Sequence, residues 1–309
     1  LIEKFAKSVK RCIVAEELAP HIETLVKAHG IKVEGKNLFP LNGEFSASLI
    51  RERVLGEKIG HKAAEGPARP PVLCSGCPHR GVFYVLSKLK LNVLGDIGCY
   101  TLGNAKPLDM VDTCLCMGAG ITMAQGLQRV EPDKRYFSFV GDSTFFASGL
   151  TGIVNAVYNE ASLTLCILDN STTAMTGHQP HPGTGHTMMG QVVDKVSIEK
   201  VLEAVGVTKI VTVDPLDLEL AVNTVKEVSG LDGVKAVIFK SPCIAVVKPT
   251  KRCRIDPDRC VHCRTCITEI GCPALVLDDG QVKIESGLCT GCGLCGRICS
   301  VGAIEEEVR

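Results

Sequence analysis

Short apolar segments alternate with amphipathic segments of helical period through the middle of the chain. The apolar segments predict strands at residues 91–95, 136–140, 163–168, 209–213 and 234–239. The segments between them predict helices at residues 118–130, 145–159, 198–204 and 216–228. Apolar strands that alternate with helices are typical of a parallel sheet covered on both faces. We therefore predict an α/β fold with a doubly wound parallel sheet over residues 72–248, which would bind ligands at the carboxyl ends of its strands.

A shorter pattern of the same kind precedes this domain. It predicts helices at residues 1–9 and 20–29 and strands at residues 11–16 and 31–33. A segment this short cannot bury a core by itself, and the sequence starts at Leu1 rather than at an initiator Met. We therefore expect residues 1–45 to be the remnant of an upstream α/β domain. The alternative is a small extension that packs on the main domain.

Two further segments complete the predicted organisation. Residues 56–71 are polar and contain Pro (GEKIGHKAAEGPARPP), so residues 46–71 are predicted to be a linker. Residues 249–309 contain an internal duplication, in which IDPDRCVHCRTC with CPALVLDDG is followed by IESGLCTGCGLC with CSVGAIEEE. A duplication of this kind predicts a separate module built from two similar halves.

The composition narrows the classes of function. Lys+Arg and Asp+Glu both number 34, so no net charge would attract nucleic acid or an anionic membrane. Neither an apolar run long enough to span a membrane nor a secretion signal is present in the sequence, which predicts a cytoplasmic protein. The chain has 17 Cys, an odd number that a reducing compartment would not pair into disulfides. Eight of them fall between Cys260 and Cys299, which indicates a cluster-binding module.

The spacing of these eight cysteines is typical of iron–sulfur ligation. Each half of the duplication has three cysteines at every third position, and the fourth ligand of each cluster is supplied by the other half. One predicted [4Fe-4S] cluster takes Cys260, Cys263, Cys266 and Cys299, and the other takes Cys289, Cys292, Cys295 and Cys272. The module resembles bacterial two-cluster ferredoxins, so a small α+β ferredoxin-like domain is expected. Five residues rather than three separate Cys266 from Cys272, and Ser300 replaces a Pro. Two structural zinc sites are the disfavoured alternative, because zinc ligands come in pairs.

Oxygen ligands follow two neighbouring predicted strands. Gly141-Asp142-Ser143 ends one strand and Asp169-Asn170 ends the next, and side chains of this type at this edge suit Mg²⁺ bound to a diphosphate. The pairing resembles the thiamine diphosphate signature. This resemblance implies that Asp142 and Asn170 ligate Mg²⁺ through side chains and Thr172 through its carbonyl. Gly118, in Met117-Gly118-Ala119-Gly120, is expected to border the thiazolium half of the cofactor.

Taken together, these motifs resemble one family, the alpha subunits of indolepyruvate ferredoxin oxidoreductases within the 2-oxoacid:ferredoxin oxidoreductases. The resemblance covers essentially the whole chain. Besides the ferredoxin repeat and the GDS to DN pair, it rests on CSGCPHRG at 74–81, GDIGCYTLG at 95–103, DTCLCMGAGI at 112–121 and TTAMTGHQPHPGTG at 172–185.

The resemblance implies oxidative decarboxylation of aryl 2-oxo acids such as indole-3-pyruvate. Aryl-acetyl-CoA would form with coenzyme A as co-substrate, and electrons would pass through the clusters to an external ferredoxin. A beta subunit and a pyrimidine-binding domain, upstream or on a separate chain, are the implied partners. The chain would then be a carboxyl-terminal portion of a larger enzyme. The alternative is a non-autonomous cofactor-binding and electron-transfer subunit of another 2-oxoacid:ferredoxin oxidoreductase.

Four other cysteines match the order in which related enzymes hold a cluster beside the thiamine ring. These are Cys74, Cys77, Cys99 and Cys243, and we hypothesise that they bind a third [4Fe-4S] cluster. The alternative is that they are small buried apolar residues. Cys12, Cys166 and Cys253 are assigned to packing or to chance. Cys114 and Cys116 are assigned to the cofactor pocket.

Three histidines are candidates for catalysis. They are His79, His178 and His181, whose imidazoles could donate to a substrate carboxylate or to the diphosphate. His186 lies in the same Gly/Pro-rich loop as the last two. The alternative is a solvated loop, or for His79 a helix-capping role.

Overall fold

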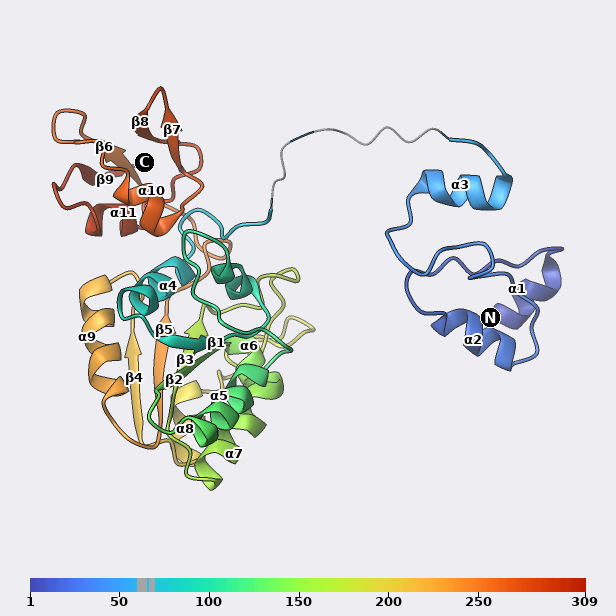
Figure 1. Cartoon of the computed structure of the whole chain (residues 1–309), viewed down its shortest axis with the longest axis horizontal. Coiled ribbons are helices and arrows are strands. Elements are labelled where there is room, and N and C mark those ends of the chain that lie inside the picture. The colour runs from blue at the N-terminus through green and yellow to red at the C-terminus, as the bar shows by residue number, and fades with distance from the viewer. Residues whose placement is uncertain (60–65, 67–69) are drawn as a thin grey trace. The chain divides into compact units, whose positions relative to one another are not determined.

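The computed structural model describes residues 1–59, 66 and 70–309, and the chain divides into two compact units, Leu1–Arg69 and Pro70–Arg309 (Figure 1). Residues 60–65 and 67–69, which belong to the predicted linker, lie outside the described residues. Among the described residues, no helix is long and apolar enough to cross a membrane.

The described residues of the first unit form three short helices. They are α1 (Ile2–Ser8), α2 (His21–Ala28) and α3 (Ala47–Leu55). The two strands predicted here are wrong: in their place lies a single isolated bridge between Ile13 and Glu34. A pair of extended segments with no further strand beside it is marginally stable, and the side chain of Glu34 instead binds the guanidinium of Arg11. Helix α3 lies within the segment assigned to the linker.

A parallel five-stranded sheet organises the second unit, in the order β1-β2-β3-β5-β4 (Figure 1). Its strands are β1 (Asn92–Leu94), β2 (Tyr136–Gly141), β3 (Leu163–Asp169), β4 (Lys209–Val213) and β5 (Val234–Lys240). β2, β3 and β5 are buried almost throughout because helices cover both faces of the sheet. The doubly wound α/β prediction is confirmed.

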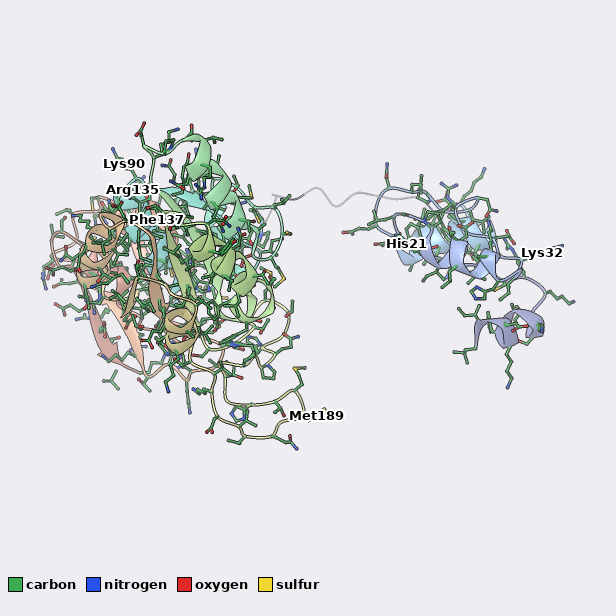
Figure 2. The ribbon with its side chains drawn as sticks, turned by 90° about the horizontal axis from the view of Figure 1, so that it is seen from below. His21, Lys32, Lys90, Arg135, Phe137 and Met189 are labelled. Atoms are coloured by element: carbon green, nitrogen blue, oxygen red, sulfur yellow. The ribbon has the colours of Figure 1, made fainter. Side chains whose placement is uncertain are left out.

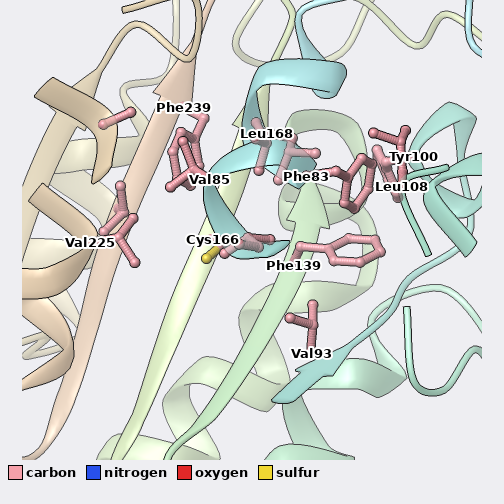
Figure 3. Packing of buried hydrophobic residues seen from close by; sticks show 14 of the residues in the cluster. Phe83, Val85, Val93, Tyr100, Leu108, Phe139, Cys166, Leu168, Val225 and Phe239 are labelled. Carbon is pink, nitrogen blue, oxygen red and sulfur yellow. The ribbon is translucent and has the colours of Figure 1, made fainter. Parts of the chain in front are cut away.

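The two faces of the sheet pack against different helices. Phe137, Phe139 and Cys166 face α4 (His79–Lys88) and α9 (Leu218–Ser229), where Phe83, Val85 and Val225 complete the core (Figure 3). The other face packs on α5 (Ala119–Val130), α7 (Leu150–Tyr158) and α8 (Ile198–Ala204). Cys166 is fully buried in this core, as predicted for a packing residue. Helix α4 was not predicted.

Shorter elements connect the sheet to its helices. They are the 3₁₀ turn η1 (Cys99–Asn104), the short helix α6 (Asp142–Thr144) and the π turn η2 (Phe145–Gly149), which leads directly into α7. A long loop joins β3 to α8, and Met189 lies exposed at its outer end (Figure 2).

The cysteine-rich end of the chain forms a small α+β module. Its antiparallel pairs are β6 (Lys251–Ile255) with β9 (Ile304–Val308), and β7 (Leu275–Asp278) with β8 (Gln281–Ile284). Its helices are α10 (Thr265–Ile270) and α11 (Leu294–Arg297), one from each half of the duplication. Helix α10 packs against α4 of the sheet domain. The ferredoxin-like prediction is confirmed.

Candidate functional site

The carboxyl ends of β2 and β3 lie side by side, because Gly141 of β2 is in register with Leu168 of β3. Asp142 follows the first strand and Asn170 the second, and both side chains are buried. Thr172 is buried as well, and all three residues line one pocket. The expected meeting of these oxygen ligands at one sheet edge is therefore present in the structure.

The pocket is formed by loops that follow three strands. Besides these three residues, its lining includes His79, Ile97, Cys99, Tyr100, Met117, Gly141, Ser143 and Met175. Gly118 lies next to the lining residue Met117, and its left-handed backbone (φ 84°) starts helix α5. The polar lining residues Asp142 and Asn170 are buried, whereas the apolar Ile97, Met117 and Met175 are partly exposed. This combination suits a cofactor with a charged tail and an aromatic ring.

Asp142 is the most constrained of the candidate metal ligands. His181 Nε2 lies 3.1 Å from Asp142 Oδ2, and neither atom has another hydrogen-bond partner among the described residues. Burial raises the pKa of Asp142, and the nearby His181 opposes that rise. A buried carboxylate oxygen with so few partners is costly unless a cation binds it, so the donor set fits a hard metal ion such as Mg²⁺.

The three candidate histidines lie in different environments. His79 is buried, its Nε2 lies 3.5 Å from Asn170 Nδ2, and burial lowers its pKa to about 4. His181 is buried against Asp142 and stacks on Phe146, with 6.0 Å between ring centroids. His178 and His186 are exposed and do not line the pocket. The structure therefore brings His79 and His181 to the site and leaves His178 outside it.

A buried pair that the sequence analysis did not single out holds this edge of the sheet together. Asp96, fully buried after β1, accepts hydrogen bonds from Tyr100 Oη (2.8 Å) and from the backbone N–H of Gly118 (2.7 Å). Tyr100 Oη in turn accepts from the backbone N–H of Gly141 at 3.0 Å. Burial and the neighbouring Asp96 raise the pKa of Tyr100 well above its usual value, so the phenol stays protonated. The sequence signal that could have revealed this pair is the position of Asp96 directly after the strand predicted at residues 91–95.

Cys74, Cys77, Cys99 and Cys243 lie close together beside this pocket. Burial raises the pKa of the Cys77 thiol to about 12, and the thiols of Cys74 and Cys99 add to the rise. Burial is also the main reason why the pKa of Cys99 is raised, and the thiols of Cys243 and Cys74 add to that rise. Cys99 itself lines the pocket. Four thiols from three separate segments fit a cubane.

In the ferredoxin-like module, five cysteines line a second cavity. They are the four predicted ligands Cys272, Cys289, Cys292 and Cys295, together with Cys253. The backbone N–H of Cys253 donates to Cys289 Sγ at 3.1 Å, so this residue, assigned above to packing, lies within a predicted cluster site.

The other predicted ligand set is more open. Burial and the thiols of Cys263 and Cys299 raise the pKa of Cys266, while Cys260 is half-buried, with its Sγ 3.8 Å from His262 Nδ1. In the part of the chain that the structure describes, no three His, Cys, Asp or Glu side chains converge on one metal ion. The ligands of a cubane bind four separate irons, one thiolate each, so they lie farther apart than the ligands of a single metal ion.

Comparisons with known proteins agree with this architecture. The family model described as "Thiamine pyrophosphate enzyme, C-terminal TPP binding domain" matches residues 96–238, and the 4Fe-4S binding domain matches residues 282–305. A solved 2-oxoglutarate:ferredoxin oxidoreductase from Magnetococcus marinus has the same fold, with a TM-score of 0.51 at 20% identity over 59% of this chain and 67% of that chain.

Curated relatives match nearly the whole chain. "Indolepyruvate oxidoreductase subunit IorA" of Archaeoglobus fulgidus is 38% identical over 99% of this chain and 53% of its own length. The protein of the same name in Pyrococcus horikoshii is 33% identical over 99% of this chain and 54% of its own length. The chain thus spans about half the length of these relatives. The predicted resemblance is confirmed: the chain is homologous along almost its whole length to IorA subunits of indolepyruvate oxidoreductases, and it combines a thiamine-pyrophosphate-binding domain with a 4Fe-4S domain.

Proposed function

We propose that this chain provides the cofactor site and the electron path of a thiamine-diphosphate-dependent 2-oxoacid:ferredoxin oxidoreductase of the indolepyruvate type. The enzyme would convert aryl 2-oxo acids, such as indole-3-pyruvate, and coenzyme A into aryl-acetyl-CoA and carbon dioxide. The two electrons released would leave through the clusters to ferredoxin. One observation carries the proposal: Cys99 lines the same pocket as Asp142 and Asn170. A cofactor bound at Asp142 and Asn170 would therefore lie next to a cluster bound by Cys99, which could accept its electrons.

The loops after β2 and β3 would hold the diphosphate and its metal. Asp142, Asn170 and Thr172 would ligate Mg²⁺, with Gly141 and Ser143 next to the diphosphate and Gly118 near the ring. Thiamine diphosphate would supply the electron sink for decarboxylation. The protein's part is to bind, to orient and to exclude water.

The two histidines at the site would position the ligand and the Asp142 carboxylate, and they would take no part in electron transfer. His79 is neutral near pH 7 because of its burial, so it can offer a hydrogen bond to a ligand without adding charge. His181 would fix the orientation of the Asp142 carboxylate through their 3.1 Å contact. The exposed His178 would take part only if the loop that carries it moves or a partner covers it.

The site would be completed by other polypeptide segments. Thiamine diphosphate is bound between two domains in this family, so a pyrimidine-binding domain, together with a beta subunit, would supply the remaining contacts. Purified anaerobically, the chain should be assayed for viologen reduction that depends on 2-oxo acid, coenzyme A and thiamine diphosphate, both alone and with the partner polypeptides. Activity that appears only with the partners would identify a non-autonomous subunit.

The substrate class and the metal site are tested in the same assay. We expect indole-3-pyruvate to be preferred over pyruvate and 2-oxoglutarate. Asp142→Ala should abolish turnover and Mg²⁺-dependent thiamine diphosphate binding, whereas Asp133→Asn on the exposed surface should leave both intact. Turnover of Asp142→Ala at the wild-type rate, or no activity toward any 2-oxo acid with the partners present, would refute the proposal.

Iron and labile sulfide contents test the third cluster separately. About twelve atoms of each per chain are expected for three [4Fe-4S] clusters, and about eight would leave only the two in the ferredoxin-like module.

A further inference from the structure

Arg80 is a buried cation in the first turn of α4, at the join between the sheet domain and the ferredoxin-like module. Only 2% of its surface is exposed. No Asp or Glu forms an ion pair with it among the described residues. Burial lowers the pKa of Arg80, and the groups whose charge opposes that change are thiols, those of Cys272, Cys77, Cys292 and Cys74. Two of these belong to the proposed third cluster site and two to the adjacent site of the ferredoxin-like module.

The Arg80 side chain donates its hydrogen bonds to backbone carbonyls that lie at or just before a cysteine. Nη1 donates to the carbonyls of Ile270 (2.7 Å) and Gly271 (2.8 Å), directly before Cys272. Nε donates to the carbonyl of Cys74 (3.3 Å), and Nη2 donates to that of Leu73. The planar fork of Arg therefore joins one cysteine loop of the sheet domain to one of the module.

A second contact joins two cysteine loops, the CSGC segment at residues 74–77 and the CTGC segment at residues 289–292. Gly76, in the CSGC segment, has a left-handed backbone (φ 73°) and faces Thr290 of the CTGC segment so closely that a Cβ would not fit. The two segments are therefore in direct contact at Gly76 and Thr290. The spacing between the two sites is therefore set by packing as well as by Arg80.

The halves of the duplication differ where Arg80 binds. Five residues separate Cys266 from Cys272, but three separate Cys295 from Cys299. Helix α10 is accordingly six residues long and α11 four. Ile270 and Gly271, at the end of the longer helix, supply both carbonyls that accept from Nη1 of Arg80. The longer segment thus contributes two of the four carbonyls that bind the guanidinium.

A buried guanidinium without a carboxylate is costly unless another negative charge balances it. A [4Fe-4S] cluster with four thiolate ligands carries net negative charge and becomes more negative when it is reduced. We propose that Arg80 is the shared countercharge of the two cluster sites that flank it, and that it holds them at a fixed spacing for electron transfer. One electron would pass from the site of Cys74, Cys77, Cys99 and Cys243 to that of Cys272, Cys289, Cys292 and Cys295, with no bond made or broken.

The inference about the pair of sites rests on the proposed function, but the effect on the module's cluster can be measured without turnover. Arg80→Met removes the charge, so the reduced clusters lose a stabilising partner. We expect the reduced fraction of the module's cluster to fall about tenfold relative to oxidised cluster at a fixed potential, a shift of about 59 mV to more negative potential. Potentiometric titration followed by electron paramagnetic resonance measures this.

Two further variants separate charge from geometry. Arg80→Lys keeps the charge but not the fork, so its potentials should stay near wild type while the magnetic interaction between the reduced clusters weakens. Lys88→Met is the matched control, because Lys88 joins the same two helices through an exposed ion pair with Glu269 (2.8 Å). It should change neither readout.

The proposal is overturned if Arg80→Met titrates as wild type does. If Arg80→Met does not assemble clusters, Arg80→Lys decides: wild-type potentials support the proposal, and a negative shift like that expected for Met overturns it. A wild-type chain that is inactive even with its partners present, and whose module cluster still shifts in Arg80→Met, would refute the proposed function and leave the role of Arg80 standing.

Discussion

Tyr100 donates a buried hydrogen bond to Asp96, with 2.8 Å between the phenol oxygen and Oδ2. Through it, the loop after β1 is tied to the end of β2, because the same phenol oxygen accepts from the N–H of Gly141, directly before Asp142. The two residues set the backbone that presents a candidate metal ligand.

Tyr100→Phe should therefore weaken both stability and metal binding. The change leaves Asp96 with one hydrogen-bond donor fewer and the Gly141 N–H without its acceptor, at a cost of about 1–3 kcal/mol. Thermal unfolding and Mg²⁺-dependent thiamine diphosphate affinity measure the two effects. Tyr158→Phe, at an exposed position, is the control, and equal behaviour of the two variants would contradict the prediction.

Gly76→Ala should disturb the contact between the two cysteine loops. Its new Cβ would collide with Thr290, in addition to the strain of a left-handed backbone. Gly280 has a similar φ of 78° but open space around it, so Gly280→Ala reports the strain alone, about 1 kcal/mol. We expect a lower melting temperature and poorer cluster incorporation for Gly76→Ala than for Gly280→Ala; indistinguishable variants would show that the loops can separate freely.

Five cysteines around one cavity allow a test of which four bind iron. Cys272→Ser should lower the iron content by up to about four atoms per chain, because it removes a predicted ligand. Cys253→Ser should retain all the iron, since that residue is predicted not to ligate. Iron and sulfide analysis after anaerobic reconstitution checks both. Loss of iron in Cys253→Ser would reassign the ligand set.

The buried Lys235 should make the free energy of unfolding depend on pH in the alkaline range. Burial lowers its pKa to about 8 in the folded chain, whereas an unfolded Lys titrates near 10.4. Between these values the unfolded chain binds more protons, so stability should rise as the pH increases from about 8 to 10.4.

Lys235→Met should remove that pH dependence. It should also stabilise the fold at pH 7 by on the order of 1–3 kcal/mol, because one pKa unit corresponds to about 1.4 kcal/mol. Denaturant unfolding at several pH values measures this, with Lys200→Met on the surface of α8 as control. A stability that is flat above pH 8 in the wild-type chain would count against the prediction.

The sheet and one edge of the site could be predicted because their signals are local. The strand that ends at Asp169 is an unbroken apolar run, and the polar residues after it stand out. The network of Asp96 and Tyr100 could not be predicted in the same way, because its partners Gly118 and Gly141 are 22 and 41 residues distant along the chain. The surroundings of Cys253 could not be predicted for a similar reason: it is buried, as expected for a packing residue, but its neighbour Cys289 is 36 residues distant along the chain.

The first turn of α4 places two neighbouring residues in two different sites. His79 faces the pocket of Asn170, and Arg80 binds the loop before Cys272. Successive residues of a helix point in directions that differ by about 100°. Whether His79 and Arg80 each face their own site therefore depends on the rotation of α4 about its axis, which is set by its distance along the chain from Cys77. A single residue inserted after Pro78 would rotate the helix by that angle and disconnect both sites in one step. A substitution at His79 or at Arg80 would thus affect one of these sites, whereas a change of length before them would affect both.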